Sequence, residues 1–332
     1  MDKDMNAPVI VFAYNRPEHL KKTLHALERA EGADVSELYL FADGYKGERD
    51  RQQVLKVHEY LKEYEKHSLF AKVHAVYGEQ NRGLAESVIT GVGSVIEKYG
   101  RVIVVEDDLL VTEDFLRYMN AALDHYEDHP DAWAVSGWTP EVPEIGALKT
   151  DTFLWYRCNS WGWATWLDRW RLIDWSMKEY PAFRYSIRRR RKMNRGGADL
   201  ADMLDMQMQG KIHSWAVRFA YAESMNDKLT VFPRETKVVN CGRDGSGTNC
   251  HDKRKESESR SGRCDGMNAV TEVSAGQQDT AACENKKEYN WGEMLPDRKL
   301  DKKIYRAYSG SRRHCLKWRI KSVLNRLGIR KF

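Results

Sequence analysis

The feature that most constrains the fold is the segment Arg101–Leu109 (RVIVVEDDL), in which four β-branched apolar residues run directly into three carboxylates. A short continuous apolar run is typical of a strand that is buried on both faces of a parallel sheet. In open α/β sheets, ligands bind where such strands end at their carboxyl side. The pattern therefore predicts that Glu106, Asp107 and Asp108 lie at a ligand-binding edge of the sheet.

Three adjacent acids at such an edge repel one another unless a cation offsets their charge. Acidic oxygen ligands suit Mg²⁺ or Mn²⁺, and a cation held by carboxylates commonly neutralises a diphosphate. The triplet thus favours a metal-dependent enzyme that acts on a nucleotide-activated substrate. The alternative is a solvated acidic turn after a core strand.

Strands and helices alternate through the first 125 residues. The helices show apolar residues at helical spacing, as Leu20, Leu24 and Leu27 do in the first of them. Strands are predicted at 8–14, 38–42, 72–77 and 101–106, and helices at 17–29, 51–64, 83–99 and 113–125. This alternation is typical of a parallel sheet with right-handed crossovers.

The second half has a different pattern. Further strands are predicted at 133–137 and 152–156, and a helix at 199–209 that Gly210 ends. Six tryptophans crowd the stretch between them: Trp155, Trp161, Trp163, Trp166, Trp170 and Trp175. Such a cluster is either core packing or a platform on which sugar rings stack, and both roles can coexist within it.

Composition places the chain among globular proteins, because 42% of its 332 residues are hydrophobic. The formal net charge of +5 does not indicate a nucleic-acid partner. The six cysteines form no CxxC pair, which argues against a zinc site and favours reduced thiols in the cytosol. The first predicted strand begins almost at the amino terminus, so we expect neither a signal peptide nor a membrane anchor.

Four motifs occur in an order that resembles GT-A-fold glycosyltransferases: Pro8–Arg16 (PVIVFAYNR), Phe41–Gly44 (FADG), Asn81–Leu84 (NRGL) and Val104–Asp114 (VVEDDLLVTED). The chain is most similar to N-acetylglucosaminyltransferase I, its protein-O-mannose relatives and bacterial polysaccharide sugar transferases. The later Ala132–Trp138 (AWAVSGW) fits the same group. The resemblance spans residues 8–250 and implies an α/β fold of the GT-A (Rossmann-like) type, with a mostly parallel central sheet flanked by helices and a mixed C-terminal part.

The resemblance also assigns donor-site roles. Asp108 would bind the divalent cation, Glu106 would orient the metal shell or contact the donor, and Asp107 would accept hydrogen bonds from sugar hydroxyls. Asp43 resembles the carboxylate that pairs with a uracil base, although an Asp before Gly is also an ordinary turn residue. Arg16 and Arg82 resemble residues that approach the diphosphate and the nucleotide, although Arg82 also fits a simple helix start.

The general base remains open between two residues, Asp199 and Asp202. Asp199 has the spacing to Gly210 that the resemblance implies, and Asp202 lies one helical turn further on the same face. Asp205 continues that line and His213 is a lesser candidate. Three acids on a solvated helix face would look the same in the sequence.

The stretch from Asn240 to Thr248 is rich in glycine but lacks the phosphate-loop pattern. Its position matches a loop that folds over the donor in similar enzymes. His251 beside it is a weak candidate for a metal ligand. Two other function classes remain: a catalytically silent sugar-binding protein, and a sugar nucleotidyltransferase, which the glycine-free turn at 13–17 disfavours.

The resemblance implies the following partners and location. The donor would be a UDP-sugar, with a GlcNAc-like sugar as the first choice, and the acceptor a glycan or a lipid-linked sugar of surface polysaccharide synthesis. Residues 312–332 hold eight Lys or Arg and no acid, with apolar residues at helical spacing. This tail predicts an amphipathic helix on an anionic membrane, or alternatively a partner-binding or packed helix. We therefore expect a cytoplasmic enzyme on the inner face of the membrane.

Four regions follow from these patterns. Residues 1–130 would form the donor-binding half and residues 131–250 the acceptor and catalytic half. Residues 251–290 contain few large apolar side chains, which predicts a flexible insert. Residues 291–332 would form the basic helical tail.

Overall fold

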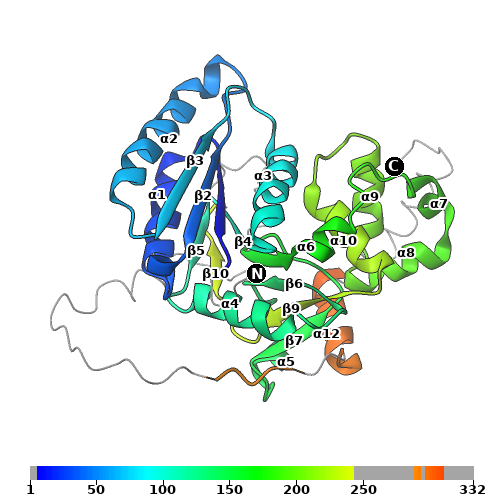
Figure 1. Cartoon of the computed structure of the whole chain (residues 1–332). Coiled ribbons are helices and arrows are strands. Elements are labelled where there is room, and N and C mark those ends of the chain that lie inside the picture. The colour runs from blue at the N-terminus through cyan, green and yellow to red at the C-terminus, as the bar shows by residue number, and fades with distance from the viewer. Residues whose placement is uncertain (1–5, 243–287, 293–295, 310–332) are drawn as a thin grey trace.

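A computed structural model of the chain describes residues 6–242, 288–292 and 296–309. A mixed sheet of eight strands runs through it in the order β3-β2-β1-β4-β8-β6-β9-β7, with helices on both faces (Figure 1). The pairs among β3, β2, β1 and β4 are parallel, whereas β8 and β7 run antiparallel to their neighbours. The predicted α/β class, with a mixed C-terminal part, is confirmed.

The strands are β1 (Val9–Ala13), β2 (Glu37–Ala42), β3 (Lys72–Tyr77), β4 (Arg101–Glu106), β5 (Leu109–Val111), β6 (Ala132–Ser136), β7 (Thr152–Trp155), β8 (Trp163–Trp166), β9 (Leu229–Pro233) and β10 (Val238–Asn240). The α-helices are α1 (Pro17–Glu28), α2 (Glu48–His67), α3 (Leu84–Tyr99), α4 (Phe115–Tyr126), α5 (Pro143–Gly146), α6 (Leu167–Arg171), α7 (Tyr180–Tyr185), α8 (Ile187–Met193), α9 (Leu200–Met208), α10 (Trp215–Met225) and α12 (Arg298–Ser309). Two short 3₁₀ helices span Ala33–Val35 and Asn194–Gly196.

The sheet is buried on both faces because its central strands are mostly apolar. Along β1, alternate residues Val9 and Val11 pack toward α1, α2 and α4. Ile10 and Phe12 point the other way, toward α3, α6 and α10. All five residues of β1 are buried, as a central strand between two helical layers requires.

The strand order reverses between β1 and β4. From β1 the chain moves outward through β2 to β3, and α3 then carries it back to place β4 on the other side of β1. A crevice forms at the carboxyl ends of the strands at such a switch point. Arg16 follows β1 and Asp107 follows β4, so both flank this point.

The tryptophan cluster serves mainly as core. Trp155, Trp163, Trp166 and Trp170 are buried, and β8 lies within the cluster as a strand that the sequence analysis did not predict. Trp161 and Trp175 are only half-buried. Most of the tryptophans are therefore part of the core. Stacking on sugar rings stays a prediction for the half-buried Trp161 and Trp175.

A helical lobe, α7 to α10 (residues 180–225), packs beside the sheet (Figure 1). Its α10 has one side against the sheet through Trp215 and Phe219 and another against α8 and α9 through Val217 and Ala220. The predicted helix at 199–209 is α9, and Gly210 follows it in the left-handed region with φ 67°. The predicted insert and tail lie largely outside the described residues, except for segment 288–292 and α12. None of the helices in the described ranges is long and apolar enough to cross a membrane.

Candidate active site at the carboxyl ends of β1, β2 and β4

Two of the predicted carboxylates share one cationic partner. The guanidinium of Arg16 donates to Asp108 Oδ2 through Nη1 over 3.0 Å and to Asp107 Oδ1 through Nη2. Asp107 is 4% exposed and Asp108 8% exposed, so the ion pairs are shielded from water. The sequence analysis placed these residues in one site, and the structure brings them into direct contact.

The third carboxylate of the triplet, Glu106, has no hydrogen-bond partner among the described residues. Burial, followed by repulsion from Asp108 and Asp107, raises its pKa to about 8. Burial also raises the pKa of Asp107 to about 6, although Arg16 opposes the shift. Asp107 and Asp108 share one arginine among the described residues, so this edge of the sheet carries more acidic than basic groups.

A two-stranded ribbon of β5 and β10 covers Asp108. Because β10 pairs antiparallel with β5, Asn240 lies opposite Leu109, next to the triplet. Asn240 Nδ2 donates to Asp108 Oδ1 over 3.3 Å, and the Cys241 backbone N–H donates to the Asp108 carbonyl over 2.9 Å. A Cβ on Gly242 would lie 2.0 Å from Asp108 Oδ2, so only glycine fits this close approach.

The sequence analysis had noted the stretch from Asn240 as a possible lid, but it did not assign Asn240 or Gly242 to the site. A signal was available, because the segment after the last strand combines a polar side chain with glycines. What the sequence could not give is the pairing with β5, since that contact spans about 130 positions of the chain.

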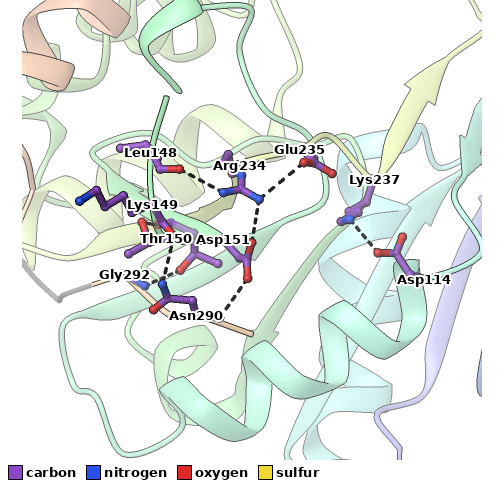
Figure 2. A network of polar contacts seen from close by, with 11 residues as sticks. Asp114, Leu148, Lys149, Thr150, Asp151, Arg234, Glu235, Lys237, Asn290 and Gly292 are labelled. Atoms are coloured by element: carbon purple, nitrogen blue, oxygen red, sulfur yellow. Dashed lines mark hydrogen bonds and ion pairs between the residues drawn. The ribbon is translucent and has the colours of Figure 1, made fainter. Parts of the chain in front are cut away.

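A polar network holds the other end of this ribbon (Figure 2). Lys237 Nζ donates to Asp114 Oδ2 over 2.7 Å, and Arg234 pairs with Asp151 over 3.0 Å. The backbone N–H of Asn290 donates to the second oxygen of Asp151, which fixes segment 288–292 to the same network. These contacts set the path of the chain from β9 to β10 and hence the position of Asn240.

Asp43 follows β2 and organises the loop before α3. Its carboxylate accepts backbone N–H groups of Arg82 and Gly83, all at 3.0 to 3.1 Å, and also that of Gly44 at 3.0 Å. This contact joins the predicted donor-site residues Asp43 and Arg82 through the backbone. The Arg82 side chain itself is exposed. Beside them, burial and a hydrogen bond to Asp50 raise the pKa of Tyr14 to about 12.

The candidate bases lie in two separate ion-pair clusters of the helical lobe. Arg157 binds Asp199 at both oxygens, with Nη1 to Oδ1 at 2.8 Å and Nη2 to Oδ2 at 3.0 Å. Arg190 of α8 binds Asp202 over 2.9 Å and Asp205 over 2.8 Å. The Asp199 side chain is 31% exposed, compared with 16% for Asp202 and 14% for Asp205.

An aromatic series links Asp199 to the edge of the sheet that carries the triplet. The Arg157 guanidinium lies 4.7 Å from the centroid of the Tyr308 ring in α12. Tyr308 contacts Trp138, and Trp138 contacts Trp161 edge-on at 5.5 Å. Trp138 follows β6 and Trp161 precedes β8, and both strand ends lie at the same sheet edge as Asp107. His213, the lesser candidate, precedes α10 and is exposed. His251 lies outside the described residues.

The comparison with protein families decides the class of this site. The model of the GNT-I family matches residues 2–179, more than half of the chain. The chain belongs to the GNT-I family. The protein is therefore a member of a glycosyltransferase family with a GT-A-type α/β fold, as the resemblance implied.

Solved structures show more distant similarity to this GNT-I family member. S. aureus TarS matches over 40% of this chain and 21% of its own length, with 14% identity and a TM-score of 0.30. The structure of TarS 1–349 matches over 70% of this chain and 59% of the TarS fragment, with 12% identity and a TM-score of 0.42. An active-site mutant of LgtC matches over 68% of this chain and 72% of the LgtC chain, with 13% identity and a TM-score of 0.32. The chain thus spans less than two thirds of either TarS chain.

Proposed function

We propose that this glycosyltransferase transfers a sugar from a UDP-sugar to an acceptor hydroxyl with inversion at the anomeric carbon, and that it requires Mn²⁺ or Mg²⁺. The observation that carries the proposal is Arg16, whose guanidinium spans Asp107 and Asp108 at the switch point, while no ion pair is formed by Glu106 within the described residues. A site of this charge, at this place in the sheet, suits a cation and a diphosphate.

The residues present fit a divalent cation. Within the described ranges, no three His, Cys, Asp or Glu side chains converge on one point. A cation at Asp108 would therefore have one or two carboxylate ligands, with substrate phosphate and water in the other positions, which is the usual arrangement for Mg²⁺. When bound, it would neutralise charge that develops on the leaving diphosphate.

Arg16 would then change partners. With a cation held at Asp108, the ion pair between Asp108 and Arg16 would be weaker, and one side of the guanidinium would be available to another anion. Arginine binds phosphate oxygens with two parallel hydrogen bonds, so the released group can hold the diphosphate. Asp43 keeps the loop 81–83 in place through the backbone, with Arg82 beside it. Pairing with a uracil N3–H would replace one of the four hydrogen-bond contacts that its carboxylate makes to backbone N–H groups. Asp107 would accept hydrogen bonds from the donor sugar.

Asp199 is our first choice for the general base. Its two hydrogen bonds to Arg157 fix the carboxylate plane, and its remaining lone pairs can accept a proton. The acceptor hydroxyl gives its proton to an Asp199 oxygen while its own oxygen attacks the anomeric carbon from the face opposite UDP. The bond to the UDP oxygen breaks as the new glycosidic bond forms. Asp202 is the second choice, because Arg190 and α8 cover it more completely.

The half-buried Trp138 and Trp161 support a glycan or a lipid-linked sugar as the acceptor, because aromatic faces stack on sugar rings. An N-acetylglucosamine-like donor and a role in surface polysaccharide synthesis follow from the family resemblance and complete the proposal. We place the enzyme in the cytoplasm at the inner membrane face. The predicted membrane-binding tail lies outside the described residues.

A donor panel tests the proposal. UDP release is measured for UDP-GlcNAc and other UDP-, GDP- and CMP-sugars, each with EDTA, Mg²⁺ or Mn²⁺. We expect release from a UDP-sugar only when a divalent cation is present, and an inverted anomeric configuration in the product by NMR. Full activity in EDTA would remove the metal from the proposal, and a preference for GDP- or CMP-sugars would remove the uracil role of Asp43.

A further inference from the structure

The short helix α8 has two chemically different faces. Its sequence is Ile187–Met193 (IRRRRKM), and only Arg190 and Met193 are buried. Arg190 pairs with Asp202 and Asp205 of α9 and lies 5.5 Å from the Phe183 ring. These contacts orient the helix, so that the residues on the opposite side point away from the lobe.

The outward side combines exposed apolar and basic residues. Tyr185 is 67% exposed and Ile187 is 62% exposed, although both are large apolar side chains. Arg188 and Arg191 are exposed beside them, one helical turn apart. We call these four residues the α8 patch. The helix α8 itself belongs to the helical lobe, away from α1 and α2 (Figure 1).

The charges of the α8 patch are not neutralised by the part of the chain that the structure describes. Neither Arg188 nor Arg191 has an ion-pair partner there, nor does Arg184 just before the patch. Two other cations of the helix do have partners, since Arg189 pairs with Glu179 at 3.1 Å and Lys192 with Asp227 at 2.7 Å. The unpaired arginines are thus confined to the outward side.

We propose that the α8 patch docks the protein on an anionic phospholipid bilayer. Arginines near such a surface are attracted to its headgroups, and exposed aromatic and aliphatic side chains enter the boundary between headgroups and acyl chains. A soluble polyanion would satisfy the arginines but gives no reason to expose Ile187. The proposal rests on the proposed location at the inner membrane face and deepens it by naming the surface that binds the bilayer, whereas the transfer reaction is tested separately.

Docking through this patch would also orient the enzyme. Arg190 fixes α8 to α9, and Asp199 directly precedes α9. The patch and the candidate base therefore belong to one rigid set of contacts. A bilayer on the outward side of α8 would place the helical lobe, rather than α1 and α2, next to the membrane.

Vesicle flotation of the full-length protein tests the proposal, with phosphatidylcholine vesicles compared with vesicles containing 30% phosphatidylglycerol. The variants are R188E/R191E and Y185S/I187S. The matched control is K56E/K62E on the exposed side of α2, which lowers the formal net charge by the same four units. All side chains changed are exposed, so thermal unfolding should stay close to that of the wild type.

We expect the wild type and K56E/K62E to float with anionic vesicles only. R188E/R191E should lose at least about tenfold in partitioning, because each basic residue near the surface contributes about 1 kcal/mol and 1.4 kcal/mol is tenfold. Y185S/I187S should also bind less well. UDP release with soluble substrates should stay unchanged in all variants, which separates this test from that of the proposed function.

Four results would overturn the proposal. They are no flotation of the wild type, equal flotation of R188E/R191E and the wild type, an equal loss in K56E/K62E, and wild-type flotation by Y185S/I187S. The second would show that another part of the chain, such as the basic tail, suffices. If Y185S/I187S floated like the wild type and the wild type bound polyphosphate tightly, the α8 patch would be a binding site for soluble polyanions.

Discussion

The donor edge of the sheet and the helical lobe hold their functional side chains in different ways. At the donor edge, Arg16 and Asp107 directly follow the strands β1 and β4, which are buried on both faces. In the lobe, Asp199 and Asp202 lie at the start of one short helix and depend on arginines from elsewhere, Arg157 and Arg190. The strand ends position the first set, whose side chains also pair with one another, whereas the second set depends on ion pairs with arginines from distant segments.

This difference has a consequence for mutations. At the donor edge, removing one side chain should change binding and catalysis while the sheet stays intact, because the strands provide the stability. In the lobe, removing an acid also leaves a buried arginine without its partner, which costs stability. The following predictions use this contrast, beginning with the largest expected effect.

Asp108→Ala should reduce turnover at least about 10³-fold, because a catalytic cation supplies several kcal/mol and each 1.36 kcal/mol is tenfold in rate. The melting temperature should change little, since Arg16 retains Asp107 as its partner. Calorimetry of UDP with and without Mn²⁺, together with a thermal melt, checks both parts. Undiminished metal-dependent UDP affinity would remove Asp108 from the site, and a collapsed fold would contradict the contrast between the two regions.

Asp199→Asn should reduce turnover by about 10²–10⁴-fold with nearly unchanged UDP affinity, which is the range for loss of a general base. Asp202→Asn is the matched comparison, because it lies on the same helix and also pairs with an arginine. It should mainly lower thermal stability, since Arg190 is buried and loses one of two acidic partners. If turnover were lost only in Asp202→Asn, Asp202 rather than Asp199 would be the general base.

Gly242→Ala should weaken UDP binding about tenfold. The new methyl group would lie 2.0 Å from Asp108 Oδ2 and 2.8 Å from Arg16 Nη1, so it must displace one of these groups. Gly146→Ala is the control, because no atom lies within 4 Å of its added Cβ. Equal UDP affinity in the two variants would show that the chain after β10 leaves Asp108 when the donor binds.

The donor edge was also the part that the sequence predicted best. An uninterrupted apolar run ending in charged residues marks both the strand and its carboxyl end, so the positions of Arg16, Asp43 and Asp107 followed from local pattern. The strand β10 was missed because three residues carry no periodicity and their pairing with β5 depends on distant chain. Arg157 and Arg190 were missed for a similar reason, since an ion pair between distant segments leaves no local signal.

The smallest expected effect on UDP binding and turnover belongs to a carboxylate far from the donor edge, whose main effect is on stability as a function of pH. Glu223 of α10 is fully buried, and it accepts hydrogen bonds from the Cys158 backbone N–H at 2.9 Å and from Thr230 Oγ1 at 2.6 Å. Burial raises its pKa from 4.5 to about 8, although these hydrogen bonds oppose the shift. It holds the loop that contains Arg157, so it supports the lobe rather than the donor edge.

Because the folded pKa of Glu223 exceeds the unfolded one, the folded state binds more protons between these two values. The free energy of unfolding should therefore fall as pH rises from about 4.5 to about 8, by up to about 1.4 kcal/mol per unit. Glu223→Gln keeps an acceptor for Cys158 and can donate to Thr230, so it should flatten this slope and be relatively more stable at pH 8 than at pH 5. Urea unfolding at both pH values measures the difference. If the free energies of unfolding of Glu223→Gln and the wild type differed by the same amount at pH 5 and at pH 8, Glu223 would ionise normally in the folded protein.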